Sequence, residues 1–296
     1  MIRTTLVLAA LLAAAALPAE AQRKRPGPPA ATAAPSAAAK PAQPGAKDWR
    51  TPSADDVLII DTNKGRIVAE LVPEVAPIHV ERVQELARAH FYDGLTFFRV
   101  IEGFMAQTGD PQNTGLGGSD KPDIKGEFIF RRSPESPWFQ VADQVTMEVG
   151  FIKSLPVASQ SMALAPMTND GKVQAWGLYC PGVLGMARSD DPNSANSQFF
   201  LMRDAYPRLE KRYTAFGRVI SGQEVVNAIK TGEPVADPQD RMERVRLLSD
   251  LPEKERPKIR VIDVKGPWFQ GEIARVRAEK GQLFSPCDLK IPVEVK

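Results

Sequence analysis

The sequence predicts a mainly β protein, folded as a closed eight-stranded antiparallel barrel with two capping helices. Eight short runs rich in apolar and β-branched residues follow one another closely, and two longer runs have the periodicity of helices. About eight strands close a barrel whose interior is just filled by side chains. A filled interior leaves no room for a ligand, so we expect a functional site on the outer face or the rim.

The chain opens with the pattern of an export signal over residues 1–21. Arg3 gives a basic start, residues 6–17 form an apolar run, and the triplet at 19–21 fits the small-x-small rule for cleavage after Ala21. An apolar run of this length cannot span a bilayer, so no stable membrane insertion is expected. The pattern predicts a periplasmic protein, with secretion as the alternative.

Composition divides the rest of the chain. Residues 22–54 consist almost entirely of Ala, Pro, Lys, Gln and Ser, and they predict a disordered linker because they cannot bury enough apolar surface to offset the entropy of ordering. We expect one folded domain over residues 55–264 and a C-terminal extension at 265–296. The 38 basic and 36 acidic residues nearly cancel and form no basic stripe, so we expect no nucleic-acid partner. We also expect a monomer.

The predicted strands begin with a hairpin. Residues 57–62 and 66–71 flank Asn63-Lys64-Gly65, a turn whose glycine favours pairing of the two runs. The other six strands are predicted at residues 97–101, 105–108, 183–188, 198–202, 214–220 and 259–264.

Two helices are predicted to cover the barrel. The first begins near Pro77, which suits the first turn of a helix, and ends near Asp93-Gly94. The second begins at residues 221–224, which fit a capping box, and Gly232 can end it in the left-handed region.

One predicted strand presents a cation from an apolar wall. Alternation along residues 97–101 places Arg99 on the face opposite Phe98 and Val100. The pattern alone favours an ordinary half-buried hairpin with a solvated arginine, because most antiparallel sheets show alternating strands with outward charges.

The inventory of reactive side chains excludes several chemistries. His79 and His90 are the only histidines, and they do not have the i, i+4 spacing of a zinc-binding helix. The two cysteines form no CxxC pair, and both the GxSxG elbow and the GxxxxGK[ST] loop are absent. We therefore expect no metal and no cofactor.

Four motifs identify a family. In chain order they are FFRVIEGFMAQTGDP, GLGGSD, GVLGMARSDDPNSANSQFFL and YTAFGRVISGQEVV. In this order they resemble the cyclophilins, so the chain is similar to a cyclophilin-type peptidyl-prolyl cis-trans isomerase, here with a bacterial type of export signal. The similarity covers residues 57–128 and 182–264, with an insertion at about 129–181 between them.

The resemblance assigns the site by position. It implies that Arg99 acts on the prolyl nitrogen as the peptide bond twists and that Gln107 orients Arg99, a mechanism that needs no cofactor. It also implies a proline pocket and a rim that bind the substrate. The implied substrate-binding residues are Phe104, Met105, Ala187, Arg188, Gln198, Phe200, Leu209 and Tyr213.

The chain departs from the family pattern at the rim. Phe98 and Tyr213 stand where many members have His, and Arg188 stands where many have Asn. Arg208 falls where many eukaryotic members carry a Trp, so tight cyclosporin binding is not expected.

The insertion has strand patterns of its own. Asn169-Asp170-Gly171 predicts a hairpin between residues 161–167 and 172–179, and residues 144–149 predict a further strand. The insertion could extend the substrate groove, dock a partner or only stabilise the domain.

Cys180 and Cys287 are the only cysteines. An exported chain reaches an oxidising compartment, so we predict that they pair, with two unrelated buried thiols as the alternative. The bridge would fasten the insertion and the extension together.

The function predicted from the sequence is therefore that of a peptidyl-prolyl cis-trans isomerase, whose partners are unfolded or flexible exported polypeptides that contain proline. The alternative is a chaperone module that binds proline peptides with little catalysis.

Overall fold

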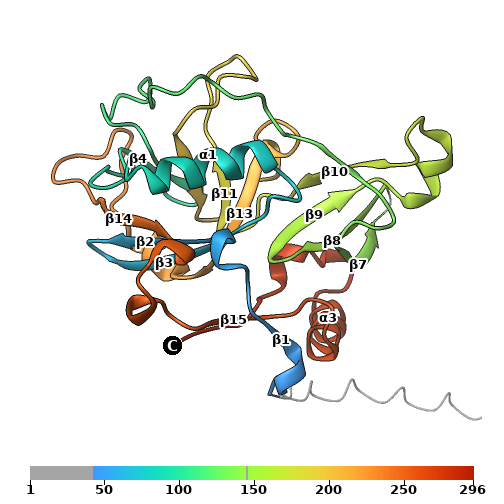
Figure 1. Ribbon diagram of the computed structural model, residues 1–296. Coiled ribbons are helices and arrows are strands. Elements are labelled where there is room, and N and C mark those ends of the chain that lie inside the picture. The colour runs from blue at the N-terminus through green and yellow to red at the C-terminus, as the bar shows by residue number, and fades with distance from the viewer. Residues whose placement is uncertain (1–42, 145) are drawn as a thin grey trace, which may run out of the picture. The chain divides into compact units, whose positions relative to one another are not determined.

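The computed structural model describes residues 43–144 and 146–296, and Figure 1 shows the described chain as three sheets with flanking helices. The predicted signal peptide and most of the predicted linker lie outside the described residues. The described chain contains an eight-stranded sheet, a five-stranded sheet and a three-stranded sheet.

The eight-stranded sheet is antiparallel throughout and has the order β14-β2-β3-β13-β11-β12-β5-β4. Its strands are β2 (Val57–Thr62), β3 (Gly65–Leu71), β4 (Arg99–Ile101), β5 (Met105–Thr108), β11 (Val183–Met186), β12 (Phe199–Met202), β13 (Ala215–Ser221) and β14 (Met242–Leu247).

The sheet curls into a half-barrel, and the predicted closure of the barrel is wrong. No ladder joins the edge strands β4 and β14, and a single bridge between Thr96 and Arg241 lies between them. The segment that follows α2 (Gln223–Ala228) occupies the free edge of β4 instead, because Gly232 and Val100 exchange two backbone hydrogen bonds of 2.8 Å. This segment prevents β14 from pairing with β4.

The eighth strand is not the predicted one. Residues 259–264 form β15 (Ile259–Ile262), which pairs with β1 (Trp49–Arg50) and β16 (Val293–Val295) in the three-stranded sheet. Strand β14 takes the eighth place, although its sequence MERVRL has charged residues between the apolar ones. Strand β1 also places ordered structure inside the predicted linker, so the linker prediction is wrong at its C-terminal end.

Most side chains on both faces of strands such as β2 and β12 are buried, which explains why these strands are almost continuously apolar. Leu58, Ile60, Phe199 and Leu201 point to the inner core together with residues of α1 (Pro77–Arg88). Their neighbours in the chain point outward into two further clusters, beneath the other two sheets.

The helix ends differ from the prediction. Helix α1 begins at Pro77 as predicted, but it ends at Arg88, just before His90 with a φ of 58°. Helix α2 is preceded by Gly222 with a φ of 90° and has no side-chain cap, so the predicted capping box is wrong. A Cβ at Gly222 would lie 2.4 Å from the carbonyl oxygen of Arg66, so the turn requires glycine.

The insertion forms the five-stranded sheet, in the order β6-β10-β9-β8-β7. Its strands are β6 (Phe130–Arg132), β7 (Trp138–Gln144), β8 (Met147–Ile152), β9 (Leu155–Ser159) and β10 (Val173–Gly177). The predicted hairpin around Asp170 is wrong, because Met162–Met167 is a 3₁₀-helix that contains Pro166, a residue that cannot donate to a ladder. The strand predicted at 144–149 is divided between β7 and β8.

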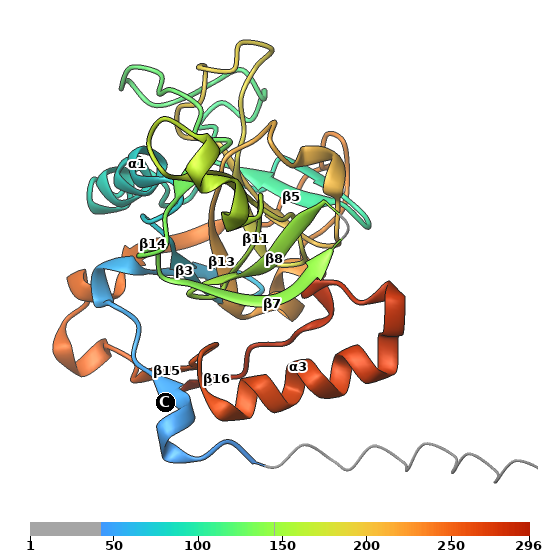
Figure 2. The ribbon, with the colours of Figure 1, turned by 90° about the vertical axis from the view of Figure 1, so that its right-hand side faces the viewer.

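The C-terminal extension packs against the insertion. Helix α3 (Pro267–Lys280), which was not predicted, runs beside β7 and β8 in Figure 2. Phe269 meets Phe151 of β8 edge to face, with ring centroids 5.6 Å apart. A disulfide joins Cys180 to Cys287, with Cα atoms 5.1 Å apart, so the extension is tied covalently to the point where the insertion rejoins the eight-stranded sheet.

Glu70 joins three parts of the chain at a buried point. Its carboxylate, on β3, accepts two hydrogen bonds from Arg50 of β1, at 2.5 and 2.7 Å. It also accepts one from the backbone N–H of Ser154, at the β8–β9 turn of the insertion. Burial alone would lower the pKa of Arg50, but the paired carboxylate of Glu70 raises it above its usual value.

Candidate active site

Side chains from adjacent strands form a row on the outer face of the eight-stranded sheet. Arg99 of β4 lies opposite Gln107 of β5, which lies opposite Phe200 of β12, which lies opposite Gly185 of β11. Directly paired residues point to the same face of a sheet. The pairing register of the strands therefore brings the side chains of Arg99, Gln107 and Phe200 together.

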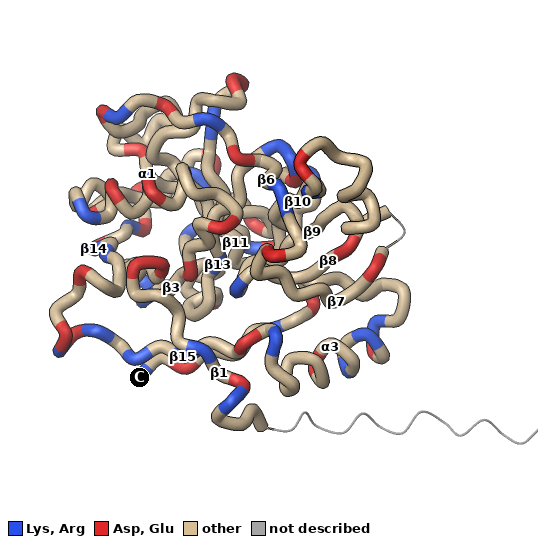
Figure 3. The backbone as a smooth tube through the Cα atoms, turned by 45° about the vertical axis from the view of Figure 1, so that its right-hand side comes forward, with Lys and Arg blue, Asp and Glu red and all other residues tan. Residues whose placement is uncertain are grey.

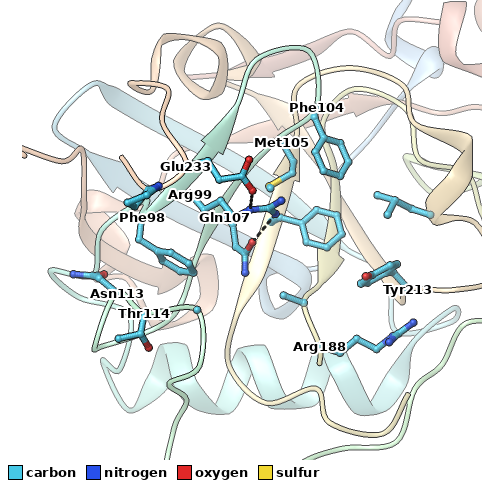
Figure 4. A pocket seen from close by; sticks show the side chains of 15 residues that line it. Phe98, Arg99, Phe104, Met105, Gln107, Asn113, Thr114, Arg188, Tyr213 and Glu233 are labelled. Atoms are coloured by element: carbon cyan, nitrogen blue, oxygen red, sulfur yellow. Dashed lines mark hydrogen bonds and ion pairs between the residues drawn. The ribbon is translucent and has the colours of Figure 1, made fainter. Parts of the chain in front are cut away.

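This row borders a hollow of about 660 Å³, shown in Figure 4. Nine of the ten residues predicted for the site line it. They are Arg99, Phe104, Met105, Gln107, Ala187, Arg188, Phe200, Leu209 and Tyr213.

Gln198, the tenth predicted residue, lies behind the hollow. The side-chain amide of Gln107 donates to Gln198 Oε1 at 2.9 Å, and Gln198 donates in turn to the carbonyl oxygen of Gly117 at 2.8 Å. Arg99 Nη1 donates to Gln107 Oε1 at 3.2 Å, so the guanidinium stands at the end of a chain of hydrogen-bonded amides. Gln198 thus supports Gln107 and also lines a neighbouring hollow.

The apolar wall depends on a glycine that sequence reasoning did not single out. Phe200 stacks on Tyr179 and meets Tyr213 edge to face, each with centroids 6.0 Å apart. A Cβ at Gly185 would lie 2.3 Å from the Phe200 ring, so only glycine leaves room for this ring position. Tyr179 comes from the end of the insertion, and burial raises the pKa of its hydroxyl well above the usual value.

Arg188 is fixed at the rim. Its guanidinium lies over the ring of Tyr213 at 4.6 Å and the ring of Phe128 at 5.5 Å. Arg188 Nε also donates to the carbonyl oxygen of Arg212 at 3.1 Å. Arg188 and Tyr213, two positions where the sequence analysis expects a departure from the family pattern, are thus in contact with each other at the rim.

Asp110 organises the loop on the other side of the hollow. Its buried carboxylate accepts hydrogen bonds from the backbone N–H groups of Gln112, Thr114, Gly115 and Gly117. Burial alone would raise the pKa of Asp110, but these four donors hold it below its usual value. The loop so fixed supplies Asn113, Thr114 and Gly115 to the lining.

Glu233 is the functional residue that sequence reasoning missed most clearly. It lines the hollow together with Pro234, and its carboxylate accepts a hydrogen bond of 2.5 Å from Arg99 Nε. No motif marks Glu233, because it reaches the site only through the pairing of its segment with β4. Phe98 also lines the hollow, whereas Arg208 does not.

No group of three or more side chains suited to a metal ion occurs within residues 43–144 and 146–296. In the same part of the chain, none of the helices has the length and apolarity that a bilayer crossing requires.

A curled antiparallel sheet with an amide-held arginine beside an aromatic and methionine pocket defines the cyclophilin class of fold and site. The family model described as cyclophilin type peptidyl-prolyl cis-trans isomerase/CLD matches residues 57–249. The chain therefore belongs to the cyclophilin-type peptidyl-prolyl cis-trans isomerases, a family that catalyses this isomerisation.

Individual relatives agree with this assignment. The chain is 34% identical over 189 residues to a probable peptidyl-prolyl cis-trans isomerase of Brucella suis biovar 1 (strain 1330), covering 60% of this chain and 73% of that protein. It is 33% identical over 190 residues to peptidyl-prolyl cis-trans isomerase-like 1 of Rhizopus delemar, covering 64% and 88%.

The similarity to one solved structure covers more of this chain than the family model does. The crystal structure of cyclophilin AquaCyp293 from Hirschia baltica is similar with a TM-score of 0.77 and 36% identity, over 83% of this chain and 93% of that chain. The similarity thus extends beyond residues 57–249.

Proposed function

We propose that this protein isomerises X-Pro bonds in exported polypeptides and so assists their folding, in the periplasm or, as the alternative, after secretion. Its partners are unfolded or flexible polypeptides that contain proline, and it acts as a monomer without a cofactor. The observation that carries the isomerase role is the Arg99 guanidinium, held by Gln107 at the wall of an apolar pocket.

Arg99 supplies the chemistry. Rotation about an X-Pro bond is slow because the nitrogen lone pair is delocalised into the carbonyl, with a barrier of about 20 kcal/mol. When the bond twists, the lone pair returns to the prolyl nitrogen and can accept a hydrogen bond from the guanidinium. Arg99 then binds the twisted state more strongly than either planar state, which lowers the barrier.

The pocket holds the proline ring while the preceding carbonyl swings. Phe104, Met105, Phe200 and Leu209 offer apolar walls of the size of the ring, and Met105, Phe200 and Leu209 are almost fully buried. A fixed ring confines the rotation to one side of the bond and brings the prolyl nitrogen under Arg99.

The isomerase role predicts that Arg99→Ala lowers kcat about 100-fold or more in a cis-to-trans assay on a short X-Pro peptide, while the affinity for the peptide changes by less than about threefold. The reason is that the charge acts mainly on the twisted state. Arg241→Ala is a control, because Arg241 is an exposed arginine paired with Glu243 away from the hollow.

Two results would contradict the proposal. A parent protein that does not exceed the uncatalysed rate would favour the chaperone module that only binds proline peptides. Equal losses of binding and turnover in Arg99→Ala would reject the role given to the charge.

Export is supported by the pattern of residues 1–21 and by the disulfide between Cys180 and Cys287, a bond typical of oxidising compartments. The test is the mass of the protein recovered from periplasmic and culture fractions of its host, where we expect a chain that begins at Gln22. Recovery of the uncleaved chain in the cytoplasm alone would reject export.

A further inference from the structure

We propose that Glu233 is a positioning residue for the reaction, which fixes the direction of the Arg99 guanidinium from the edge opposite Gln107. The inference rests on the isomerase role of Arg99 and adds to it a second anchor. In Figure 4 the Glu233 carboxylate and the Gln107 amide meet Arg99 from different sides.

The two contacts use different atoms of the guanidinium. Nε donates to Glu233 Oε1 at 2.5 Å, and Nη1 donates to Gln107 Oε1 at 3.2 Å. The hydrogen bonds found among the described residues leave Nη2 for the substrate. Because the guanidinium is planar with its N–H groups in a fixed fork, two bound atoms determine the orientation of the whole plane.

Arg99 needs a second anchor because of its place in the sheet. Strand β4 is an edge strand of three residues, and β5 alone pairs with it within the sheet. The Arg99 side chain is 35% exposed, and a free arginine side chain has many rotamers, so its entropy opposes a fixed position. With Gln107 alone, the guanidinium could pivot about a single hydrogen bond of ordinary length.

The backbone that carries Glu233 is itself fixed beside β4. Gly232 exchanges two hydrogen bonds with Val100, and the N–H of Val235 donates to the carbonyl oxygen of Phe98 at 2.8 Å. Gln239 Nε2 closes the same loop by donating to the carbonyl oxygen of Val235 at 2.9 Å. The carboxylate therefore reaches Arg99 from a segment that runs alongside β4.

If Glu233 had the opposite role, that of weakening Arg99, its removal would have the opposite effect on kcat. As the one carboxylate among the residues that line the described hollow, it could instead neutralise Arg99 and slow the reaction. The geometry favours positioning, because Glu233 accepts from Nε and the hydrogen bonds found among the described residues leave Nη2 for the substrate. The two roles differ in the sign of the effect on kcat.

The experiment compares Glu233→Ala with Glu233→Gln in the full exported chain. Glutamine keeps an oxygen that can accept the hydrogen bond from Nε, whereas alanine removes it. We expect kcat to fall about tenfold in Glu233→Ala with KM changed by less than about twofold, and Glu233→Gln to recover at least about half of the parent kcat. The ¹⁵N–¹H signal of Arg99 Nε, assigned by its loss in Arg99→Lys, should broaden or shift toward free arginine in Glu233→Ala alone.

Glu243→Ala is the matched control, because Glu243 is also a partly exposed carboxylate paired with an arginine but lies outside the hollow. Activity of the parent and of this control establishes the isomerase function independently of Glu233. A kcat in Glu233→Ala equal to or above that of the parent would overturn the proposal. A loss confined to KM, or equal losses of kcat in the alanine and glutamine variants, would overturn it too.

Discussion

At the scale of single residues, Phe200 is the side chain around which the pocket is built. It lies opposite Gly185 in the sheet, stacks on Tyr179 beneath it and touches Tyr213 at its edge. Two of these neighbours, Gly185 and Tyr213, come from the eight-stranded sheet and the loop before β13, while Tyr179 comes from the end of the insertion. The ring position therefore depends on residues from three separate segments of the chain.

Gly185→Ala tests this dependence. The added Cβ would lie 2.3 Å from the Phe200 ring, so the ring must move into the proline pocket. We expect kcat/KM to fall about tenfold, and the free energy of unfolding to fall by about 1–3 kcal/mol, as for other overpacked cores. Gly271→Ala, where a Cβ meets nothing within 4 Å, is the control and should leave activity unchanged. Parent-like activity in Gly185→Ala would contradict this account of the pocket.

Asp110 gives the site loop a dependence on pH. Its pKa is held below the ordinary 3.8, so the folded state favours the ionised form. The resulting stabilisation is fully present above the unfolded pKa and is lost as the pH falls through the lower folded pKa. We expect Asp110→Asn to be less stable than the parent by about 1–3 kcal/mol at pH 7, because three or more backbone donors lose a charged acceptor.

The difference between parent and Asp110→Asn should shrink as the pH is lowered from about 4 toward 2, when the parent carboxylate becomes protonated. Urea unfolding of both proteins over this range measures it. A difference that stays constant down to pH 2 would show that the charge of Asp110 has no part in stabilising the loop.

At the scale of elements, specific ionic contacts join the sheets in addition to the apolar clusters between them. Glu70 links β1, β3 and the β8–β9 turn, and Lys153 in the same turn pairs with Asp56 at 3.0 Å and with Glu74 at 2.8 Å. Elsewhere charges of both signs are interspersed along the described chain, as Figure 3 shows. Some of the buried ionic contacts thus lie where the insertion meets the core, whereas the pair of Arg132 and Glu148 lies within the insertion itself.

Glu70→Gln should be costly for this reason. Glu70 is 1% exposed, and the substitution leaves the Arg50 guanidinium without its counter-charge in a largely buried place. We expect the free energy of unfolding to fall by about 2–4 kcal/mol, slightly less than for fully buried pairs because Arg50 keeps some contact with water. Glu294→Gln, in an exposed pair with Arg260, should cost less than about 1 kcal/mol. Equal costs in chemical denaturation would contradict the importance of burial here.

The disulfide should matter for stability but not for turnover. Cys180 and Cys287 close a loop with a sequence separation of 107 residues, and neither cysteine lines the hollow. We expect the double variant Cys180→Ser, Cys287→Ser to lose about 2–4 kcal/mol of stability while kcat/KM stays within about twofold. Two free thiols in the denatured, unreduced parent protein would reject the bridge, and a large loss of turnover would reject its independence from the site.

At the scale of the whole molecule, sequence patterns predicted the elements whose structure depends on residues close together in the chain. Strands β2 and β5 have the bounds expected from alternation and turn residues, and the site residues on β4, β5 and β12 follow from motif positions. Helix α3 had a readable signal as well, with Pro267 in its first turn, Phe269, Ile273 and Val276 on one side, and Gly281 after its end.

The rest depends on contacts between distant segments. Strand β14 alternates charged with apolar residues and shows its role only through its partner β2. The segment around Gly232 occupies the edge of β4 in the open half-barrel, and the same contact places Glu233 beside Arg99. Neither segment contains a periodicity or motif from which its contact with a distant strand could be predicted.

The pairing of β1 with β15 has a consequence for the order of folding. A chain that emerges from a ribosome or a translocation pore with its N-terminus first exposes β1 long before β15 has appeared. The β7–β8–β9 meander needs only tight turns and can form as soon as it emerges. The earliest described strand is therefore among the last whose partner emerges, because Ile262, the partner of Trp49, follows every strand of the eight-stranded sheet in the chain.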